Sequence, residues 1–174
     1  GAGAQSARHR FGCRILCRLI EHSGTSSELA LLLAEVLAEA EELCRHPFAH
    51  YVIQAILEHM PAHRPRIVQA LCAEALSNAC HRSASHVMES ALEYCDEAAR
   101  QEMLWVVLGG GAESIAWLAQ NQYGSFVLRT LLKVPGGPSE EAIVHLSQLA
   151  ACLAGTRHGQ RLLQDVGLSA PGDA

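Results

Sequence analysis

Aromatic residues are scarce in this sequence, with three Phe, two Trp and three Tyr among 174 residues. Because aromatic and β-branched residues favour strands, this scarcity beside abundant Leu and Ala argues against a β-sandwich or barrel and predicts helices. Apolar residues make up 49% of the chain and charged residues 18%, which argues against a disordered polar chain. A chain of this length has enough residues for one domain with a sizeable core.

Positive charge is not in excess either. The 13 Lys and Arg residues are outnumbered by 18 Asp and Glu, giving a formal net charge of -5. The chain as a whole therefore lacks the basic surface expected of a nucleic-acid binder, and any RNA site has to gather its positive charge locally. No stretch approaches the roughly 20 uncharged apolar residues that span a bilayer, and no signal-peptide pattern opens the chain. We expect no membrane association.

Patterns typical of metal sites and enzymes are weak. The seven cysteines are odd in number and lie mostly in Leu/Ala-rich stretches, which favours reduced thiols in a reducing compartment. Cys13 with Cys17 and His46 with His50 have the i, i+4 spacing of metal ligands, but no second pair lies nearby. No order of catalytic residues or nucleotide motif stands out. We therefore expect neither an enzyme nor a cofactor or metal site.

A repeat emerges when the sequence is compared with itself. Its segments start 35 to 40 residues apart: HRFGCRILCRLIEH from His9, HPFAHYVIQAILEH from His46, HRSASHVMESALEY from His81, NQYGSFVLRTLLKV from Asn121 and TRHGQRLLQDVG from Thr156. Each has a small residue at the fourth place, and aliphatic pairs recur at the seventh and eighth and at the eleventh and twelfth places. This i, i+1, i+4, i+5 spacing is one face of a helix, so each segment is predicted to be an amphipathic helix.

Leu/Ala-rich stretches between these segments predict further helices over residues 25–44, 64–80, 97–119 and 139–154. Within them, Trp105 and Trp117 are expected to anchor packing. Units of about 36 residues with two or three helices each stack into an α-solenoid. We therefore expect a disordered N-terminal stub over 1–8, an array over 9–167 with units at 9–24, 25–60, 61–95, 96–134 and 135–167, and a disordered tail over 168–174.

The fifth, sixth and ninth places of each segment lie on one arc of the predicted helix, away from the aliphatic pairs. The sixth place always holds a flat side chain, which suits stacking on unstacked bases, and the flanking places hold short or hydrogen-bonding groups. The candidate site residues are Cys13, Arg14 and Cys17; His50, Tyr51 and Gln54; Ser85, His86 and Glu89; Ser125, Phe126 and Arg129; and Gln160, Arg161 and Gln164.

The segments resemble the RNA-binding helices of Pumilio-type (PUF) repeats, most closely in HPFAHYVIQ from His46 and NQYGSFVLR from Asn121. The resemblance implies a right-handed α-solenoid that binds single-stranded RNA on its concave face, one base per repeat. It also implies messenger RNA as the ligand, post-transcriptional regulation as the role, and regulatory proteins as partners on the convex face. We expect a monomer in the cytoplasm, with the nucleolus or an organelle as alternatives.

The resemblance further implies a base for two repeats. Ser85 with Glu89 resembles the pair that reads guanine, and Ser125 with Arg129 resembles the pair associated with cytosine. Since RNA runs antiparallel to the array in this family, a 5′-CG-3′ core would lie over repeats four and three. The other pairs do not match a common pair fully: Cys13 with Cys17, which begins like the adenine pair but lacks its Gln, His50 with Gln54, and Gln160 with Gln164.

Two alternatives remain open at this point. The acidic balance and the unmatched pairs are compatible with a solenoid that has lost RNA binding and recognises proteins. A PUF-like factor that processes ribosomal RNA is a second alternative. For RNA binding, we expect basic side chains such as Arg14, Arg18, Arg129 and Arg161 on the concave face and acidic ones on the outer helices. Glu89 is either a guanine reader or an ordinary exposed helix residue.

Overall fold

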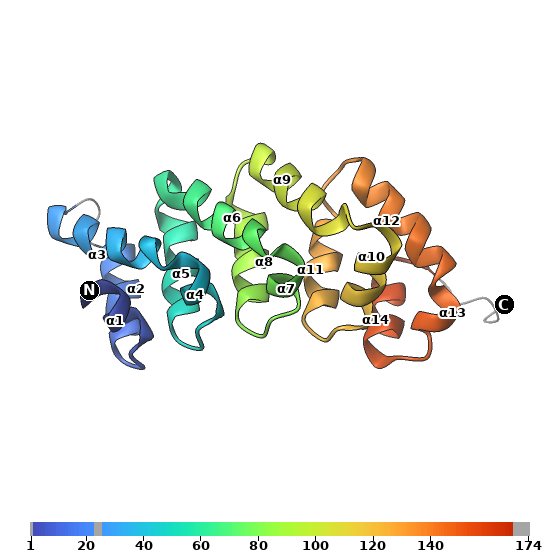
Figure 1. Ribbon diagram of the computed structural model, residues 1–174, viewed down its shortest axis with the longest axis horizontal. Helices are drawn as coiled ribbons and strands as arrows, with labels where there is room; N and C mark the ends of the chain where they lie inside the picture. The colour runs from blue at the N-terminus through green and yellow to red at the C-terminus, as the bar shows by residue number, and fades with distance from the viewer. Residues whose placement is uncertain (1, 23–25, 169–174) are drawn as a thin grey trace.

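The computed structural model describes residues 2–22 and 26–168, and every secondary-structure element within these ranges is a helix. The helices follow one another in an elongated row from one end of the chain to the other (Figure 1). Five of them lie in the repeated segments, and we call them the repeat helices: α2 (Gly12–His22), α5 (Ala49–His59), α8 (Ala84–Tyr94), α11 (Gly124–Leu131) and α14 (Arg157–Asp165).

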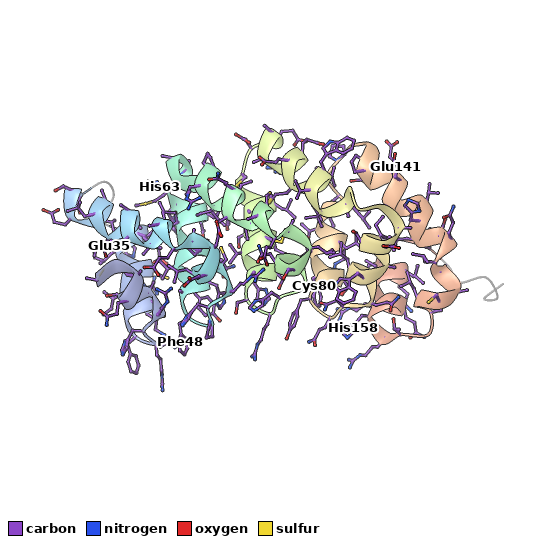
Figure 2. All side chains as sticks on the ribbon, viewed as in Figure 1. Glu35, Phe48, His63, Cys80, Glu141 and His158 are labelled. Atoms are coloured by element: carbon purple, nitrogen blue, oxygen red, sulfur yellow. The ribbon has the colours of Figure 1, made fainter. Side chains whose placement is uncertain are left out.

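Two other kinds of helix connect the repeat helices. The leading helices lie along one edge of the row: α3 (Ser27–Ala38), α6 (Arg64–Ala73), α9 (Glu97–Leu108) and α12 (Gly137–Gln148). Each is followed by a shorter helix, and these are α4 (Ala40–Arg45), α7 (Ala75–Ala79), α10 (Gly111–Gln120) and α13 (Ala150–Leu153). The 3-10 turn η1 (Pro61–His63) joins α5 to α6. In Figure 2, His63 and Glu141 lie at the edge of the leading helices, and Phe48 and His158 lie at the opposite edge.

The core runs through the whole row because each repeat helix packs against the next one. The aliphatic pairs form this contact. Val52 and Ile53 of α5 and Val127 and Leu128 of α11 are fully buried, as the repeat pattern predicts. One unit alone could not cover these side chains, so each unit depends on its neighbours for a core. The all-α solenoid predicted from the sequence is confirmed. None of the helices in the described residues is long and apolar enough to span a bilayer.

The first repeat helix departs from the buried pattern. Ile15 is 62% exposed and Leu19 is 37% exposed, whereas Leu16 and Ile20 on the neighbouring arc are buried. In α5, α8 and α11 the residues at the places of Ile15 and Leu19 are all buried. Within the described residues α2 has no repeat helix before it, so this half of its apolar face stays in solvent.

The expected disorder of the N-terminal stub is wrong for residues 2–8, which form helix α1 (Ala2–Arg8). Ala4 and Ala7 are buried, because small side chains let α1 lie close against α3. The backbone N–H of Gly3 donates to Glu35 Oε2 at 2.5 Å, and Arg8 pairs with two glutamates of the next unit. At the other end, Leu168 is half-buried, and the rest of the expected tail lies outside the described residues.

The two tryptophans do not anchor the core as expected. Trp105 in α9 is 61% exposed and Trp117 in α10 is 63% exposed. Their helices place Leu104, Leu108 and Leu118 in the core instead, and the indoles fall on the outward arc. Helical periodicity alone could not distinguish these arcs, because α9 and α10 carry apolar residues on more than one face.

The first and fourth places of each segment set where the repeat helix begins. Asn121 Oδ1 accepts from the backbone N–H groups of Tyr123 and Gly124 at 2.8 and 2.9 Å. Such a cap satisfies donors that the first helical turn leaves free. At the fourth place, a Cβ added to Gly124 would lie 2.9 Å from the carbonyl oxygen of Leu118. The short helix before each repeat helix thus passes too close for a large side chain.

Candidate nucleic-acid interface

The sixth-place side chains project from the row as the pattern predicts. Arg14, Tyr51, His86 and Arg161 are exposed, and Phe126 is half-buried. Tyr51 is 54% exposed although the residue that follows it is fully buried. Because each of these side chains stands at the same place of successive packed helices, the surface presents flat groups at a regular pitch.

The fifth-place side chains are more deeply placed than the arc suggested. Cys13, His50, Ser85 and Ser125 are buried, and of the five only Gln160 is exposed. Two of them donate to carbonyls of the preceding turn: Ser125 Oγ to Gln122 O at 3.1 Å, and Cys13 Sγ to Arg10 O at 3.4 Å. Four of the fifth places therefore form the floor of the surface, below the projecting sixth-place groups.

The ninth-place side chains lie at intermediate depth. Cys17, Gln54, Glu89 and Arg129 are half-buried, and Gln164 is exposed. Burial, aided by the charges of Cys13 and Glu21, raises the pKa of the Cys17 thiol to about 11. Cys17 is therefore a neutral thiol at neutral pH and offers only a weak hydrogen bond.

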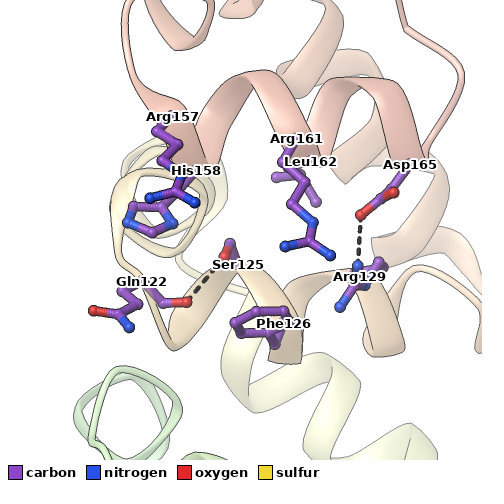
Figure 3. A pocket seen from close by; sticks show the side chains of 9 residues that line it. All are labelled: Gln122, Ser125, Phe126, Arg129, Arg157, His158, Arg161, Leu162 and Asp165. Carbon is purple, nitrogen blue, oxygen red and sulfur yellow. Dashed lines mark hydrogen bonds and ion pairs between the residues drawn. The ribbon is translucent and has the colours of Figure 1, made fainter.

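Hollows lie at three of the junctions between repeat helices and are lined by several of these side chains. The hollow between α2 and α5, of about 560 Å³, has Cys13, Arg14, Cys17 and Tyr51 among its lining residues. A second, of about 430 Å³, is lined mainly from α5 and α8 and includes Gln54. The hollow between α11 and α14, of about 190 Å³, is shown in Figure 3. Three junctions thus bring together nine of the predicted site residues: Cys13, Arg14, Cys17, Tyr51, Gln54, Ser125, Phe126, Arg129 and Arg161. The other six line none of these hollows: His50, Ser85, His86, Glu89, Gln160 and Gln164.

Positive charge gathers at the two ends of the row. Arg10, Arg14 and Arg18 line the hollow between α2 and α5. The hollow between α11 and α14 is lined by Arg129 and Arg161 and also by two residues that the sequence pattern did not single out, Arg157 and His158. Both stand at the start of α14, outside the three places that the repeat suggested, so only the packing of α14 on α11 reveals them. The hollow between α5 and α8 carries acidic side chains instead, Glu21, Glu58 and Glu93.

Three of the ninth-place side chains have polar partners. Gln54 Nε2 donates to Ser90 Oγ of the next repeat helix at 2.8 Å. Arg129 Nη1 donates to Asp165 Oδ2, also in the next repeat helix, at 2.5 Å (Figure 3).

Glu89 Oε2 lies 3.6 Å from His86 Nδ1 within its own helix. Sequence reasoning missed Ser90 and Asp165, which stand at the tenth place of their segments. The tenth place does not belong to the arc of the fifth, sixth and ninth places.

His50 gives the floor its one imidazole. Its Nδ1 lies 2.9 Å from the carbonyl oxygen of His46, and its ring centroid lies 6.4 Å from that of His86 in a stacked arrangement. Burial, chiefly, lowers the pKa of His50, so the ring is neutral at neutral pH. It donates through Nδ1 to the carbonyl, which leaves Nε2 as an acceptor.

No cluster of three or more His, Cys, Asp or Glu side chains suited to a metal ion occurs in residues 2–22 and 26–168. All seven cysteines are free thiols. Burial raises the pKa of Cys44 to about 12 and that of Cys72 to about 11. These thiols are therefore poor nucleophiles and poor metal ligands at neutral pH.

A solenoid of short helical units, with flat and hydrogen-bonding side chains over its junctions, is the architecture of a repeat protein that binds an extended polymer. The model of the Pumilio-family RNA binding repeat matches residues 7–37, 40–72, 79–108 and 114–140. The chain belongs to this family. The fifth repeated segment lies beyond these matches, and there the structure places α14 against α11.

Relatives and solved structures agree with this assignment. Pumilio homology domain family member 4 of Saccharomyces cerevisiae is 29% identical over 168 residues, covering 90% of this chain and 19% of its own length. Pumilio homolog 9 of Arabidopsis thaliana is 30% identical over 142 residues, covering 81% of this chain and 24% of its own. The chain thus spans about a quarter or less of these two relatives.

Among solved structures, a double mutant of Puf4 bound to the Cox17 RNA 3′ UTR recognition sequence has a TM-score of 0.79 and 28% identity. The match covers 92% of this chain and 56% of the Puf4 chain. The Puf3 RNA binding domain bound to site B of the Cox17 RNA 3′ UTR has a TM-score of 0.83 and 21% identity, covering 94% and 46%. The second likeness concerns the fold alone.

Proposed function

We propose that this chain binds single-stranded RNA across its repeat helices, one base per repeat, and serves in post-transcriptional regulation of messenger RNA. The observation that carries the proposal is that each repeat helix presents a flat side chain at its sixth place, and that four of the five line the hollows between repeat helices: Arg14, Tyr51, Phe126 and Arg161. Stacking on flat side chains tolerates every base, so it supplies affinity, and the groups between them supply selectivity. The solved complexes of related domains with RNA support the same ligand.

Each base would lie over a junction, stacked on a sixth-place side chain, with its edge toward the fifth and ninth places. Glu89 accepts hydrogen bonds only, and guanine offers two adjacent donors on its Watson–Crick edge. Arg129 donates only, and cytosine offers two adjacent acceptors. Buried Ser85 and Ser125 on the floor complete these two pairs. We therefore propose guanine at repeat three and cytosine at repeat four.

The basic ends of the row would hold the phosphates. Arg10, Arg14 and Arg18 at one end and Arg157 and Arg161 at the other are exposed. These five arginines can neutralise few phosphates. The RNA affinity should therefore fall as the salt concentration rises, but only with a shallow slope. The cytoplasm is the proposed compartment, since messenger RNA is regulated there, and a monomer is the proposed state.

A protein partner on the leading helices is a second proposal. The exposed side chains of Trp105 and Val106 in α9 and of Ile143 and Val144 in α12, a helix that packs against α9, favour it. Exposed apolar groups of this size are typical of protein contacts. The acidic hollow between α5 and α8 also suits a solenoid that recognises proteins instead of RNA. A partner on the leading helices and RNA on the repeat helices would use different faces and are separable by mutation.

Fluorescence anisotropy with a labelled randomised RNA pool tests the RNA proposal. Tyr51→Ala removes one stacking group, at a cost of about 1–3 kcal/mol of binding energy. The Kd for the pool should therefore rise about five- to a hundredfold. Trp105→Ala, which removes an equally exposed aromatic side chain from a leading helix, is the matched control and should leave the Kd unchanged. Equal effects of the two changes, or no binding by the unaltered chain, would contradict the proposal.

A further inference from the structure

The polar contacts of the ninth place fall into a pattern across the junctions. At two junctions the ninth-place side chain of one repeat helix forms a hydrogen bond with the tenth-place side chain of the next repeat helix. This occurs for Gln54 with Ser90 and for Arg129 with Asp165. The other two junctions differ. The tenth place opposite Cys17 is an alanine, and the tenth place opposite Glu89 is Thr130, whose hydroxyl donates within its own helix.

Arg129 is held from two sides. Its Nη1 donates to Asp165 Oδ2 at 2.5 Å, and its guanidinium carbon lies 4.9 Å from the centre of the Phe126 ring (Figure 3). Phe126 is the flat side chain on which the base of repeat four would stack. The side chain that would read the base edge therefore rests over the stacking ring, and the carboxylate of the next unit keeps it there.

The negative charge of Asp165 is unfavourable at its position for two reasons. It is the last residue of α14, where the helix dipole disfavours a negative charge. It also lines the hollow between α11 and α14, where a carboxylate repels the phosphates of an approaching RNA. Its ion pair with Arg129 offsets both effects, which ties the two residues together as a unit.

We propose that Asp165 is a specificity-determining residue of repeat four, acting through Arg129. It restrains the guanidinium, so a base must compete with the carboxylate before Arg129 can read its edge. Repeat four consequently discriminates between bases less than a free arginine would. The tenth place of the following repeat helix thus tunes the ninth place, and Ser90 plays the same role for Gln54. This inference rests on the proposed RNA binding.

The test measures base preference. RNA is selected from a randomised pool with the unaltered chain, and each position of the selected sequence is then varied to all four bases. Arg129→Ala identifies the position read by repeat four, because base preference should change there alone. At that position Asp165→Asn should increase the preference for cytosine about two- to fivefold, the range expected from freeing a partly exposed ion pair. The two side chains of this pair are 27% and 34% exposed.

Removing a carboxylate also strengthens binding to every RNA, and two controls separate this effect. Glu93→Gln removes a carboxylate that lines the hollow between α5 and α8 and should strengthen all sequences alike. In the Arg129→Ala background, Asp165→Asn should leave base preference unchanged, since the residue through which it acts is gone. Asp165→Glu keeps the charge and should keep a preference close to that of the unaltered chain. Circular dichroism checks that α14 stays folded in each variant.

Several outcomes would overturn the inference. They are an Asp165→Asn effect that is uniform across positions, a reduced preference for cytosine, or an equal change of preference with and without Arg129. Each would arise while the chain still binds RNA, so the proposed function would stand. If the unaltered chain binds no RNA in the pool, the proposed function and this inference fall together.

Discussion

His46 Nδ1 lies 3.2 Å from the backbone nitrogen of Ala49 and accepts the hydrogen bond of that N–H at the start of α5. The same nitrogen also accepts from the N–H of Phe48 at 3.2 Å. His9 and His81 cap α2 and α8 in the same way. A ring nitrogen accepts only while it carries no proton, so protonation of His46 or His81 would remove the cap of its helix.

This capping makes stability depend on pH. Burial, and next the charge of Arg8, lower the pKa of His46, while burial, and next the charge of Arg45, lower that of His81. Because the unfolded chain then takes up protons more readily than the folded one, the stabilisation is fully present above the unfolded pKa of about 6.5. It is lost as the pH falls from there towards the lowered folded pKa. Thermal unfolding followed at pH 7.5 and pH 5.5 should show the loss.

Asn121 provides the control for this prediction, because its side chain caps α11 at the same place without titrating. A double variant, His46→Asn with His81→Asn, should keep the caps and unfold with a weaker pH dependence. A residual slope is expected from His50, whose pKa burial also lowers. An unchanged slope in the double variant would show that these caps do not carry the effect.

The aliphatic pairs allow the effect of an Ile→Ala substitution to be compared at a buried and at an exposed position. Ile56 at the eleventh place of α5 is fully buried, whereas Ile15 at the seventh place of α2 is mostly exposed. Ile56→Ala should lower the free energy of unfolding by about 2–5 kcal/mol, since it leaves a cavity in the core. Ile15→Ala should change it by less than about 0.5 kcal/mol. Urea denaturation measures both, and similar losses would contradict the burial pattern.

Gly159 stands at the fourth place of the last segment, where a Cβ would overlap the carbonyl oxygen of Leu153 and lie 2.7 Å from Thr156 Oγ1, the cap of α14. Alanine usually stabilises a helix relative to glycine, by about 0.5–1 kcal/mol. Here Gly159→Ala should instead destabilise the chain, by about 1–3 kcal/mol, as overpacking does. Gly155→Ala, where the Cβ would meet only the carbonyl oxygen of Cys152 at 3.3 Å, is the control and should destabilise less. A rise in melting temperature for Gly159→Ala would refute this account.

The sequence was sufficient for the solenoid because its signal repeats. A buried Val52 at one place predicts a buried Val127 at the same place, and the structure confirms both. The repeat could not predict contacts that occur at single junctions, such as the pair of Arg129 with Asp165. It also could not predict the helix over residues 2–8, which has no counterpart among the five segments and depends on its packing against α3.

The depth of the fifth place was missed for a related reason. A helical arc gives the direction of a side chain relative to its own helix, but burial also depends on the neighbouring helix. Ser85 and Ser125 share the arc of His86 and Phe126, yet they are buried in the packing of α8 and α11 against their neighbouring helices. The sequence predicted the five repeat helices correctly, but the depth of side chains at the junctions between them required the structure.

Glu89 provides the sharpest test of base reading. It is half-buried at the ninth place of α8, with Oε2 3.6 Å from His86 Nδ1, on a surface where a carboxylate repels phosphate. Glu89→Gln should reduce the preference for guanine at one RNA position by about 1–3 kcal/mol, by analogy with bidentate base contacts. The free energy of unfolding should change by less than about 0.5 kcal/mol. If Glu89 is instead an ordinary helix residue, the variant would bind every RNA slightly more tightly, because a like charge has been removed. Anisotropy titrations with four RNAs that differ only at that position distinguish the two outcomes, and uniform strengthening would refute the guanine assignment.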